Sequence, residues 1–238
     1  MSQSQTLCLL PGLLCDATVW APQRAALSSS SDIHVPNFWG LSSFADMARK
    51  VLDEVPGPLA VAGHSMGARV ALELWRLAPD RLRRLALLST GFHGPRPEET
   101  SKRMALVDLA YKKGMAEVAR VWLPPMVHPD RIGDAALMEP LVDMVRRATP
   151  EIFEGQQRAG LNRPDAAAYL PNISCPTLIL CGRQDGWSPP AQHEEMAALI
   201  PGARLVLLDG CGHMATVERP AEVTEELIRW LAVPERAA

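Results

Sequence analysis

A serine lies between two glycines at residues 63–67, in the sequence Gly-His-Ser-Met-Gly. A serine hydroxyl becomes a useful nucleophile when a base within hydrogen-bond reach removes its proton and a third group orients that base. The short pattern occurs by chance, so its setting carries the argument. An apolar run at 58–62 precedes it, and apolar residues at helical spacing follow it. Strand, sharp turn and helix form the setting of a nucleophile elbow, which would expose the hydroxyl of Ser65 above the end of the strand.

His213 is the predicted base among the six histidines of the chain. It follows the last expected strand, in a glycine-rich loop that can carry its side chain over the elbow. His64 adjoins the serine, but neighbouring residues on the elbow point in different directions, so a structural role is expected for it. His193 lies in an expected helix and is predicted to be solvated. The others fall in an expected strand (His34) and in the segment 91–170 (His93 and His128).

Asp185 is the predicted third member, because it lies in the turn after the strand expected at 176–181. Its carboxylate would fix the tautomer of His213 and stabilise the imidazolium that forms during attack. The alternative is that Asp185 only caps the helix that follows. Asp209 is a rival acid, but it lies too close to His213 in the chain to span the imidazole ring comfortably. The order Ser65, Asp185, His213 is typical of this arrangement.

The oxyanion that forms during acyl transfer needs preorganised N–H donors. The amide of Met66, at the start of the elbow helix, is one predicted donor. The loop after the first expected strand, at 11–16, would supply the other. The amide of Leu13 is preferred there, with Leu14 as the alternative, and Asp16 is expected to brace the loop through backbone hydrogen bonds.

The elements that must position these groups alternate between short apolar runs and helical patterns. This alternation is typical of a parallel sheet with helices on both faces. Strands are expected at 6–10, 32–36, 59–62, 82–89, 176–181 and 203–208. Helices are expected at 20–27, 44–51, 66–77, 191–200 and 221–231.

Residues from about 91 to 170 show helical patterns and no convincing strand. This stretch is longer than one crossover connection needs, so an inserted helical lid is favoured over ordinary crossover helices. The expected domains are an α/β core at 1–90 and 171–238 and a helical lid at 91–170. Charge within this stretch is balanced, with eleven Lys or Arg and eleven Asp or Glu residues.

The bulk composition excludes several classes of function. The 238 residues carry a formal net charge of −3 and no run long enough to span a membrane, so neither nucleic acid nor a membrane is an expected partner. The amino-terminal residues lack the pattern of a signal peptide. Five cysteines without Cys-x-x-Cys disfavour a disulfide framework or a zinc site and suggest reduced thiols in a cytoplasmic protein. Cys15 is the exception that is expected to face the active site.

Four motifs match, in order, those of a known family: Leu-Leu-Pro-Gly (9–12), Gly-His-Ser-Met-Gly (63–67), Cys-Pro-Thr-Leu-Ile-Leu-Cys-Gly-Arg-Gln-Asp (175–185) and Gly-His-Met (212–214). The chain resembles, nearly end to end, the α/β-hydrolase fold superfamily in its small, lid-bearing carboxylesterase-like branch. The expected fold is therefore an α/β-hydrolase fold with about six mostly parallel strands and an inserted helical lid. Among the departures from the family pattern, the His-Gly of many members' oxyanion loop is Pro11-Gly12 here.

The resemblance implies hydrolysis of a carboxylic ester or thioester through an acyl-enzyme, without a metal or organic cofactor. A small-molecule ester with a small to medium apolar acyl group is the expected substrate. Each apolar residue near the expected pocket could instead pack the lid. The predicted substrate-binding residues are Leu14, Trp122, Leu123, Met126 and Trp187.

Other activities of the same superfamily stay open at this point. The same catalytic groups would serve an aminopeptidase, a cofactor-free perhydrolase or a carbon–carbon bond hydrolase, and the pocket could act as a ligand receptor. An aminopeptidase would hold its substrate amine with lid acids such as Glu151 or Glu154. The superfamily includes an esterase that acts on a carrier-protein-bound ester, but the balanced lid charge does not indicate carrier-protein docking. A monomer or homodimer is expected.

Overall fold

The computed structural model describes residues 5–235, and its centre is a six-stranded sheet in the order β2-β1-β3-β4-β5-β6. All five pairs of neighbouring strands are parallel. The strands are β1 (Thr6–Leu10), β2 (Ile33–His34), β3 (Leu59–His64), β4 (Leu82–Leu88), β5 (Thr177–Gly182) and β6 (Arg204–Leu208). This sheet confirms the expected α/β class.

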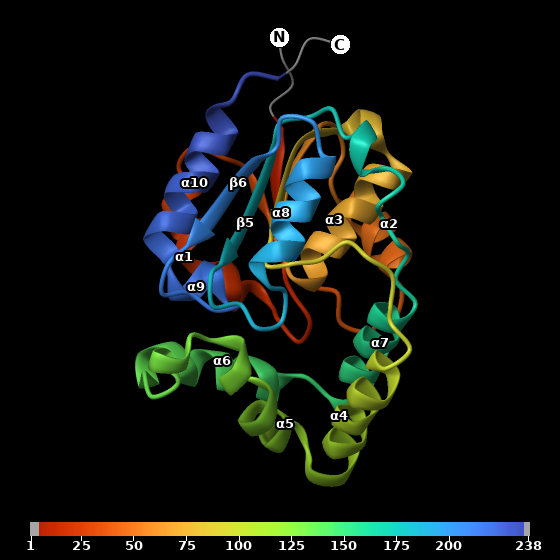
Figure 1. Ribbon diagram of the computed structural model, residues 1–238, viewed down its shortest axis with the longest axis vertical. Coiled ribbons are helices and arrows are strands. Elements are labelled where there is room, and N and C mark those ends of the chain that lie inside the picture. The colour runs from red at the N-terminus through yellow and green to blue at the C-terminus, as the bar shows by residue number, and fades with distance from the viewer. Residues whose placement is uncertain (1–4, 236–238) are drawn as a thin grey trace.

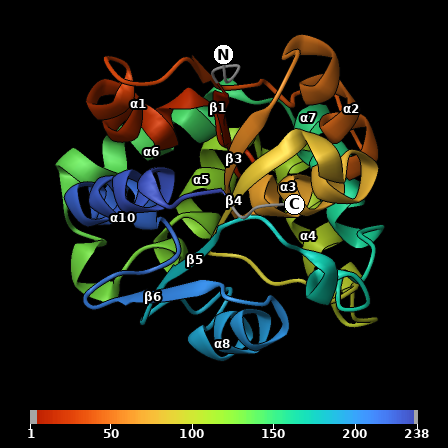
Figure 2. The same ribbon diagram turned by 90° about the horizontal axis from the view of Figure 1, so that it is seen from above.

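Alternate residues of the central strands point to opposite faces of the sheet, as the pleat requires. Leu7 and Leu9 of β1 belong to one buried cluster, whereas Cys8 and Leu10 belong to another. Figure 2 shows α1 and α10 on one side of the sheet and α2 and α3 on the other. The helices that cover the two faces are α1 (Ala21–Leu27), α9 (Ala215–Glu218) and α10 (Pro220–Ala232), and then α2 (Phe44–Glu54), α3 (Met66–Leu77) and α8 (Pro190–Leu199).

Between β4 and β5 the described chain forms helices and no strand, as the sequence predicts. We call residues 91–170 the helical segment. Figure 1 shows its labelled helices below the ends of the strands, on the side toward which β5 and β6 point. Its helices are α4 (Glu99–Lys113), α5 (Met115–Trp122), α6 (Ala135–Arg147) and α7 (Pro150–Leu161). The described chain also contains short 3-10 turns: η1 (Ala17–Trp20), η2 (Pro79–Arg81), η3 (Pro124–Met126), η4 (Pro129–Arg131) and η5 (Leu170–Asn172).

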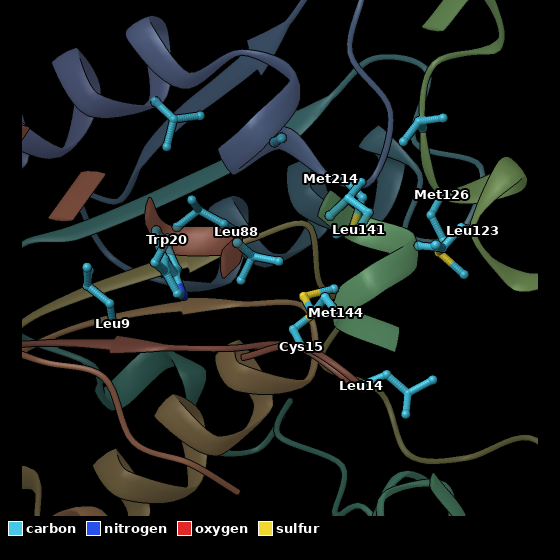
Figure 3. Packing of buried hydrophobic residues seen from close by; sticks show 14 of the residues in the cluster. Leu9, Leu14, Cys15, Trp20, Leu88, Leu123, Met126, Leu141, Met144 and Met214 are labelled. Atoms are coloured by element: carbon cyan, nitrogen blue, oxygen red, sulfur yellow. The ribbon is translucent and has the colours of Figure 1, made fainter. Parts of the chain in front are cut away.

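The helical segment packs directly onto the core. One continuous buried cluster joins residues of β1 and β3 to residues of α5 and α6. Figure 3 shows Leu141 and Met144 of α6 in a group with Cys15 and Met214, which belong to loops of the core. Burial of this shared apolar surface holds the segment over the carboxyl ends of the strands.

Several elements end up to three residues from their expected bounds; α2, for example, continues to Glu54 rather than ending at residue 51. The strand expected at 32–36 is reduced to Ile33–His34 at the edge of the sheet, because Pro36 has no amide hydrogen with which to extend the ladder. The helix expected at 20–27 begins earlier, with a 3-10 turn at Ala17–Trp20 whose N-cap is Asp16. The side chain of Asp16 accepts a hydrogen bond from the amide of Thr18 (2.8 Å).

None of the five cysteines, all of which lie within residues 5–235, forms a disulfide. The expectation that Cys15 faces the active site is wrong, because its side chain is buried in the core and its thiol donates to the carbonyl of Leu13 (3.4 Å). Burial raises the pKa of this thiol well above its usual value. Over residues 5–235, no helix is long and apolar enough to cross a bilayer.

Candidate active site

Ser65 lies between the end of β3 and the start of α3, with a φ of 54° and a ψ of −113°. Such a conformation is strained for a residue with a side chain and is typical of functional turns. The flanking glycines are required for close packing. A Cβ on Gly67 would lie 2.1 Å from the carbonyl oxygen of Leu10, and a Cβ on Gly63 would lie 2.4 Å from the amide of Ala68. The serine therefore takes the left-handed conformation while the glycines let neighbouring backbones approach.

The structure brings Ser65, His213 and Asp185 into one chain of hydrogen bonds. The Nε2 atom of His213 lies 2.9 Å from the Oγ atom of Ser65. The Nδ1 atom of His213 lies 2.8 Å from Oδ2 and 3.0 Å from Oδ1 of Asp185. The histidine and aspartate are both buried. The three side chains come from loops that follow β3, β5 and β6, so the carboxyl edge of the sheet assembles them.

Asp185 also accepts hydrogen bonds from the backbone amides of Trp187 (2.9 Å) and Ser188 (2.8 Å) through Oδ1. The capping role considered from the sequence therefore coexists with the contact to His213. Burial opposes ionisation of Asp185, but the charge and hydrogen bond of His213 and the Ser188 amide lower the pKa of the carboxyl below its usual value. An ionised Asp185 accepts from Nδ1–H of His213, which leaves Nε2 free to accept from the Ser65 hydroxyl.

The loop after β1 and the start of α3 leave two amides without acceptors. Within the part of the chain that is described, neither the Leu13 amide nor the Met66 amide donates to any acceptor. The amide of Leu14, the alternative oxyanion donor considered from the sequence, donates to Oε1 of Gln156 (2.7 Å). It is therefore not free to donate to an oxyanion. Leu14 also has a left-handed φ of 59° and a fully buried side chain. Gln156, a residue that the sequence analysis missed, therefore holds this loop from α7.

The ring of His64 forms a hydrogen bond with the backbone of the loop that carries His213. Burial lowers the pKa of His64 to about 4, so its ring is neutral near pH 7. Its Nε2 atom lies 2.9 Å from the carbonyl oxygen of His213, which can only accept, so Nε2–H is the donor. A Cβ on Gly12 would lie 3.0 Å from Nδ1 of His64, so this glycine gives the ring its space. This placement fits the structural role expected for His64.

Glu218 is a second residue that the sequence analysis missed. Its buried carboxyl accepts from the backbone amides of Gly212 (3.1 Å) and Met214 (3.1 Å), which flank His213. It also accepts from the amide of His128 in the helical segment (2.7 Å). The carbonyl of Met126 accepts from the amide of His213 (2.9 Å). No local pattern in the sequence predicts that this glutamate, which ends the short helix α9, is buried and accepts these hydrogen bonds.

The other histidine and carboxylate residues considered from the sequence as site candidates do not contact Ser65. The prediction that His193 is solvated is wrong, because its ring is fully buried and its Nε2 atom accepts from the amide of Thr90 (2.9 Å). Asp209, the rival acid, is exposed and pairs with Arg183 (2.7 Å). Glu154, a candidate for binding a substrate amine, pairs with Arg158 on the surface of α7 (2.6 Å).

A cavity of about 350 Å³ opens beside Ser65 and His213, between the core and the helical segment. Three of the predicted substrate-binding residues line it, namely Trp122, Met126 and Trp187. Leu14 and Leu123 are not among its lining residues, because both side chains are fully buried in the hydrophobic core. A larger hollow of about 700 Å³ lies near the amino ends of β1 and β3 and does not include Ser65.

The cavity is not the apolar pocket that the sequence suggests. Apolar side chains form only part of its lining, and Gln156 contributes a polar side chain. Arg69 could have been identified from the sequence, since it follows Ser65 by four residues and shares its helical face. Five basic residues, which we call the basic cluster, also line the cavity: Arg69, Arg96, Lys102, Arg103 and Arg163.

Comparisons with known proteins place this geometry in a family context. A model described as "Alpha/beta hydrolase family" matches residues 6–226, a range that contains Ser65, Asp185 and His213. The pimeloyl-[acyl-carrier protein] methyl ester esterase of Nitrosomonas europaea is 26% identical over 231 residues, which cover 91% of each chain.

Two solved structures share the fold over nearly the whole chain. A thermophilic esterase from Thermogutta terrifontis is similar with a TM-score of 0.87 at 27% identity, over 96% of this chain and 90% of that one. The enol-lactonase from Burkholderia xenovorans LB400 is similar with a TM-score of 0.87 at 25% identity, over 98% of this chain and 93% of that one.

Proposed function

The chain belongs to the α/β hydrolase family, and from this premise we propose that it is a serine hydrolase that cleaves carboxylic esters or thioesters. The observation that carries the proposal is the hydrogen-bond chain from Ser65 through His213 to the buried Asp185. Relatives named as an esterase, an enol-lactonase and a methyl ester esterase support the same reaction class.

In the proposed reaction, Oγ of Ser65 attacks the carbonyl carbon of the ester while Nε2 of His213 takes the hydroxyl proton. Asp185 keeps Nδ1–H of His213 in place and stabilises the positive charge that the ring gains. His213 then gives the proton to the leaving alcohol or thiol, which leaves an acyl-enzyme on Ser65. A water molecule, deprotonated by His213, attacks this acyl-enzyme and releases the acid.

The amides of Leu13 and Met66 are the proposed oxyanion hole. Both lack an acceptor within residues 5–235, and both residues line the cavity beside Ser65. Donors held in place before the reaction stabilise the developing negative charge without reorganisation. Gln156 supports this arrangement by occupying the neighbouring amide of Leu14 (2.7 Å).

We further propose that the helical segment at 91–170 is a lid domain over a core formed by residues 1–90 and 171–238. Its position over the carboxyl ends of the strands supports this division (Figure 1). Trp122 and Met126 from the segment, with Trp187 from the core, are the proposed apolar contacts to the acyl group.

The substrate class to test first is a small-molecule ester. The Nitrosomonas relative is named for an ester on an acyl carrier protein. The sequence-based expectation that carrier proteins do not dock therefore has no support from the comparisons.

The test is steady-state hydrolysis of p-nitrophenyl acetate, butyrate, octanoate and laurate by the wild-type protein and by Ser65→Ala. Multiple turnovers that disappear in the variant are the expected result, and the preferred chain length then measures the acyl pocket. A wild-type rate no higher than that of the variant for every ester would overturn the proposed function. A single turnover without product release would indicate a receptor.

A further inference from the structure

The cavity beside Ser65 concentrates positive charge that the helical segment as a whole does not carry. The segment has equal numbers of basic and acidic residues. In contrast, five basic residues but only two glutamates, at 98 and 99, line the cavity. Arg96, Glu98 and Lys102 are exposed to solvent, so water screens their charges. The partly buried charged residues of the lining carry an excess of two positive charges, namely Arg69, Arg103 and Arg163 against Glu99.

Glu99 forms ion pairs with two members of the basic cluster. Its carboxylate pairs with Arg163 (2.6 Å) and with Arg103 (3.2 Å). Although burial opposes ionisation, Arg163 and the Arg96 amide lower the pKa of Glu99 to about 2. Arg163 uses its whole guanidinium, with five hydrogen bonds to Glu99 and to backbone carbonyls. Arg163 is therefore a structural brace, since it has no donor left for a ligand.

Arg69 is in the opposite situation. Its guanidinium makes one hydrogen bond, from Nη1 to the carbonyl of His93 (2.9 Å), and pairs with no carboxylate among the residues described. Burial, and after it the charge of Arg163, lower its pKa to about 9, although the charges of Glu99 and Asp165 partly oppose this shift. Arg69 lies one helical turn beyond Ser65, a rise of about 6 Å along the axis of α3.

Arg103 keeps part of its donor capacity as well. It donates to Glu99 (3.2 Å) and to Oε1 of Gln157 (2.8 Å), and its guanidinium lies 5.8 Å from the ring centroid of Trp187. A guanidinium has five N–H donors, so donors remain on Arg103 for a further acceptor. Arg69 and Arg103 both line the cavity.

Two neutral donors in the same lining also lack acceptors. The Nε2 atom of Gln156 and the Nε1 atom of Trp122 are buried and have no hydrogen-bond partner in residues 5–235. A purely apolar acyl chain would leave these N–H groups unpaired and would offer no carboxylate partner to Arg69. The lining therefore favours a ligand with several oxygen acceptors and negative charge.

We propose that the cavity binds esters whose acyl chain ends in a carboxylate, that is, short monoesters of dicarboxylic acids. This inference rests on the proposed hydrolase function and names its substrate class. Arg69 and Arg103 hold the distal carboxylate through their free N–H groups, in the forked geometry that guanidinium and carboxylate share. The ester carbonyl then lies at Ser65. The cavity volume of about 350 Å³ is large enough for a short acyl chain with a terminal carboxylate.

The test compares two esters of equal acyl length, mono-p-nitrophenyl adipate and p-nitrophenyl hexanoate. Both are hydrolysed by the wild type, Arg69→Gln and Arg103→Gln. Arg76→Gln is the matched control, because Arg76 lies on the same helix, pairs with Glu73 and does not line the cavity. Thermal unfolding verifies that each variant is folded.

The wild type is expected to have a higher kcat/KM for the adipate ester. Each cavity variant should reduce the adipate-to-hexanoate ratio by about 10- to 100-fold, the range for a charge-assisted hydrogen bond. Arg76→Gln should leave the ratio unchanged. Equal or better hydrolysis of the hexanoate ester, with the ratio unaffected in both cavity variants, would overturn the inference and leave the hydrolase function standing.

A binding measurement decides the inference separately from catalysis. Trp122 and Trp187 line the cavity, so their fluorescence can report titration with free adipate or with inorganic phosphate. Adipate should bind the wild type more tightly than phosphate does, and Arg69→Gln should weaken adipate binding. Tighter binding of phosphate would overturn the assignment to a carboxylate. If neither ester turns over, the proposed function fails and this titration alone decides the inference.

Discussion

The α/β core and the helical segment line the same cavity, but they supply different kinds of group. The core contributes Ser65, His213 and Asp185 from three loops at one edge of the sheet. The helical segment contributes Trp122, Met126 and most of the basic cluster. Under the proposed function, the groups that react would come mainly from loops after strands, whereas the groups that contact the substrate would come mainly from helices.

The division is incomplete, and its exceptions are informative. Gln156 of the helical segment holds the loop of Leu13 through the neighbouring amide, and Met126 accepts from the backbone of His213. Arg69 of the core, in turn, belongs to the basic cluster. The helical segment therefore also positions loops of the core, and the core also contributes to the basic cluster.

The largest expected effect tests whether the core alone supplies the acid. Asp185→Asn should lower kcat by about 10⁴-fold while leaving the fold intact, because the amide favours the wrong tautomer of His213. Asp209→Asn is the matched control, since Asp209 is exposed and pairs with Arg183. Steady-state ester hydrolysis measures both variants. A severe loss in Asp209→Asn with little change in Asp185→Asn would reverse the assignment.

Acid should destabilise the core through two buried histidines. Burial lowers the pKa of both His64 and His193 from 6.5 to about 4. Between these values the unfolded chain binds protons that the folded protein excludes, so the free energy of unfolding falls as pH falls through this window. From pH 7 to pH 5 the loss is about 2 kcal/mol for each histidine.

Urea unfolding at pH 7 and pH 5 measures this loss, and His193→Gln should reduce the pH dependence by about half. His34→Gln, a change at a partly exposed residue of β2, is the control. The pKa of Asp185 is lowered, so its contribution is lost only at more acidic pH. An unchanged pH dependence in His193→Gln would contradict the assignment to that ring.

Gln156 tests whether the helical segment contributes to the chemical step. Gln156→Leu removes the acceptor of the Leu14 amide and should lower kcat by about tenfold, with a smaller change in KM, because the loop of the proposed oxyanion hole loses its support. Gln156→Glu keeps an acceptor oxygen and should restore most of kcat. If KM alone changes in Gln156→Leu, the residue acts only in binding.

The smallest expected effect concerns the ion pair between Arg147 of α6 and Asp16 of the core (2.6 Å). Both side chains are partly exposed, at 47% and 26%, so water screens the pair. Arg147→Met should lower the free energy of unfolding by less than about 1 kcal/mol. A double-mutant cycle with Asp16→Asn measures the coupling. A coupling free energy above about 2 kcal/mol would contradict this expectation and would indicate that the ion pair, rather than the shared apolar cluster, holds the helical segment on the core.

Sequence reasoning located the groups of the core because local patterns mark them. Ser65 is flanked by glycines after an apolar run, and Asp185 and His213 each follow a strand-like run. Strand ends in a parallel sheet meet at one edge, so their proximity could be predicted before any coordinates. The fold class followed from the same alternation of apolar runs and helical patterns.

The cavity lining was not predictable in the same way. The spacing of Arg69 from Ser65 indicates a shared helical face, but nothing in the sequence around Arg103 indicates that it lines the same cavity. Leu14 and Leu123 look like pocket residues, but they pack into the core. His193 lies in a polar stretch of α8, yet its ring is buried, and its Nε2 atom accepts from the amide of Thr90. Such placements depend on tertiary packing rather than on sequence period.

The hydrogen bonds that tie the helical segment to the core set limits on exchanging it between relatives. The carbonyl of Met126 accepts from the amide of His213, and Gln156 accepts from the amide of Leu14. A chimaera that imports a foreign segment to alter selectivity would also replace these two acceptors. Useful grafts would therefore keep Gln156 and the backbone path through Met126, and would vary the residues of α4 that face the cavity.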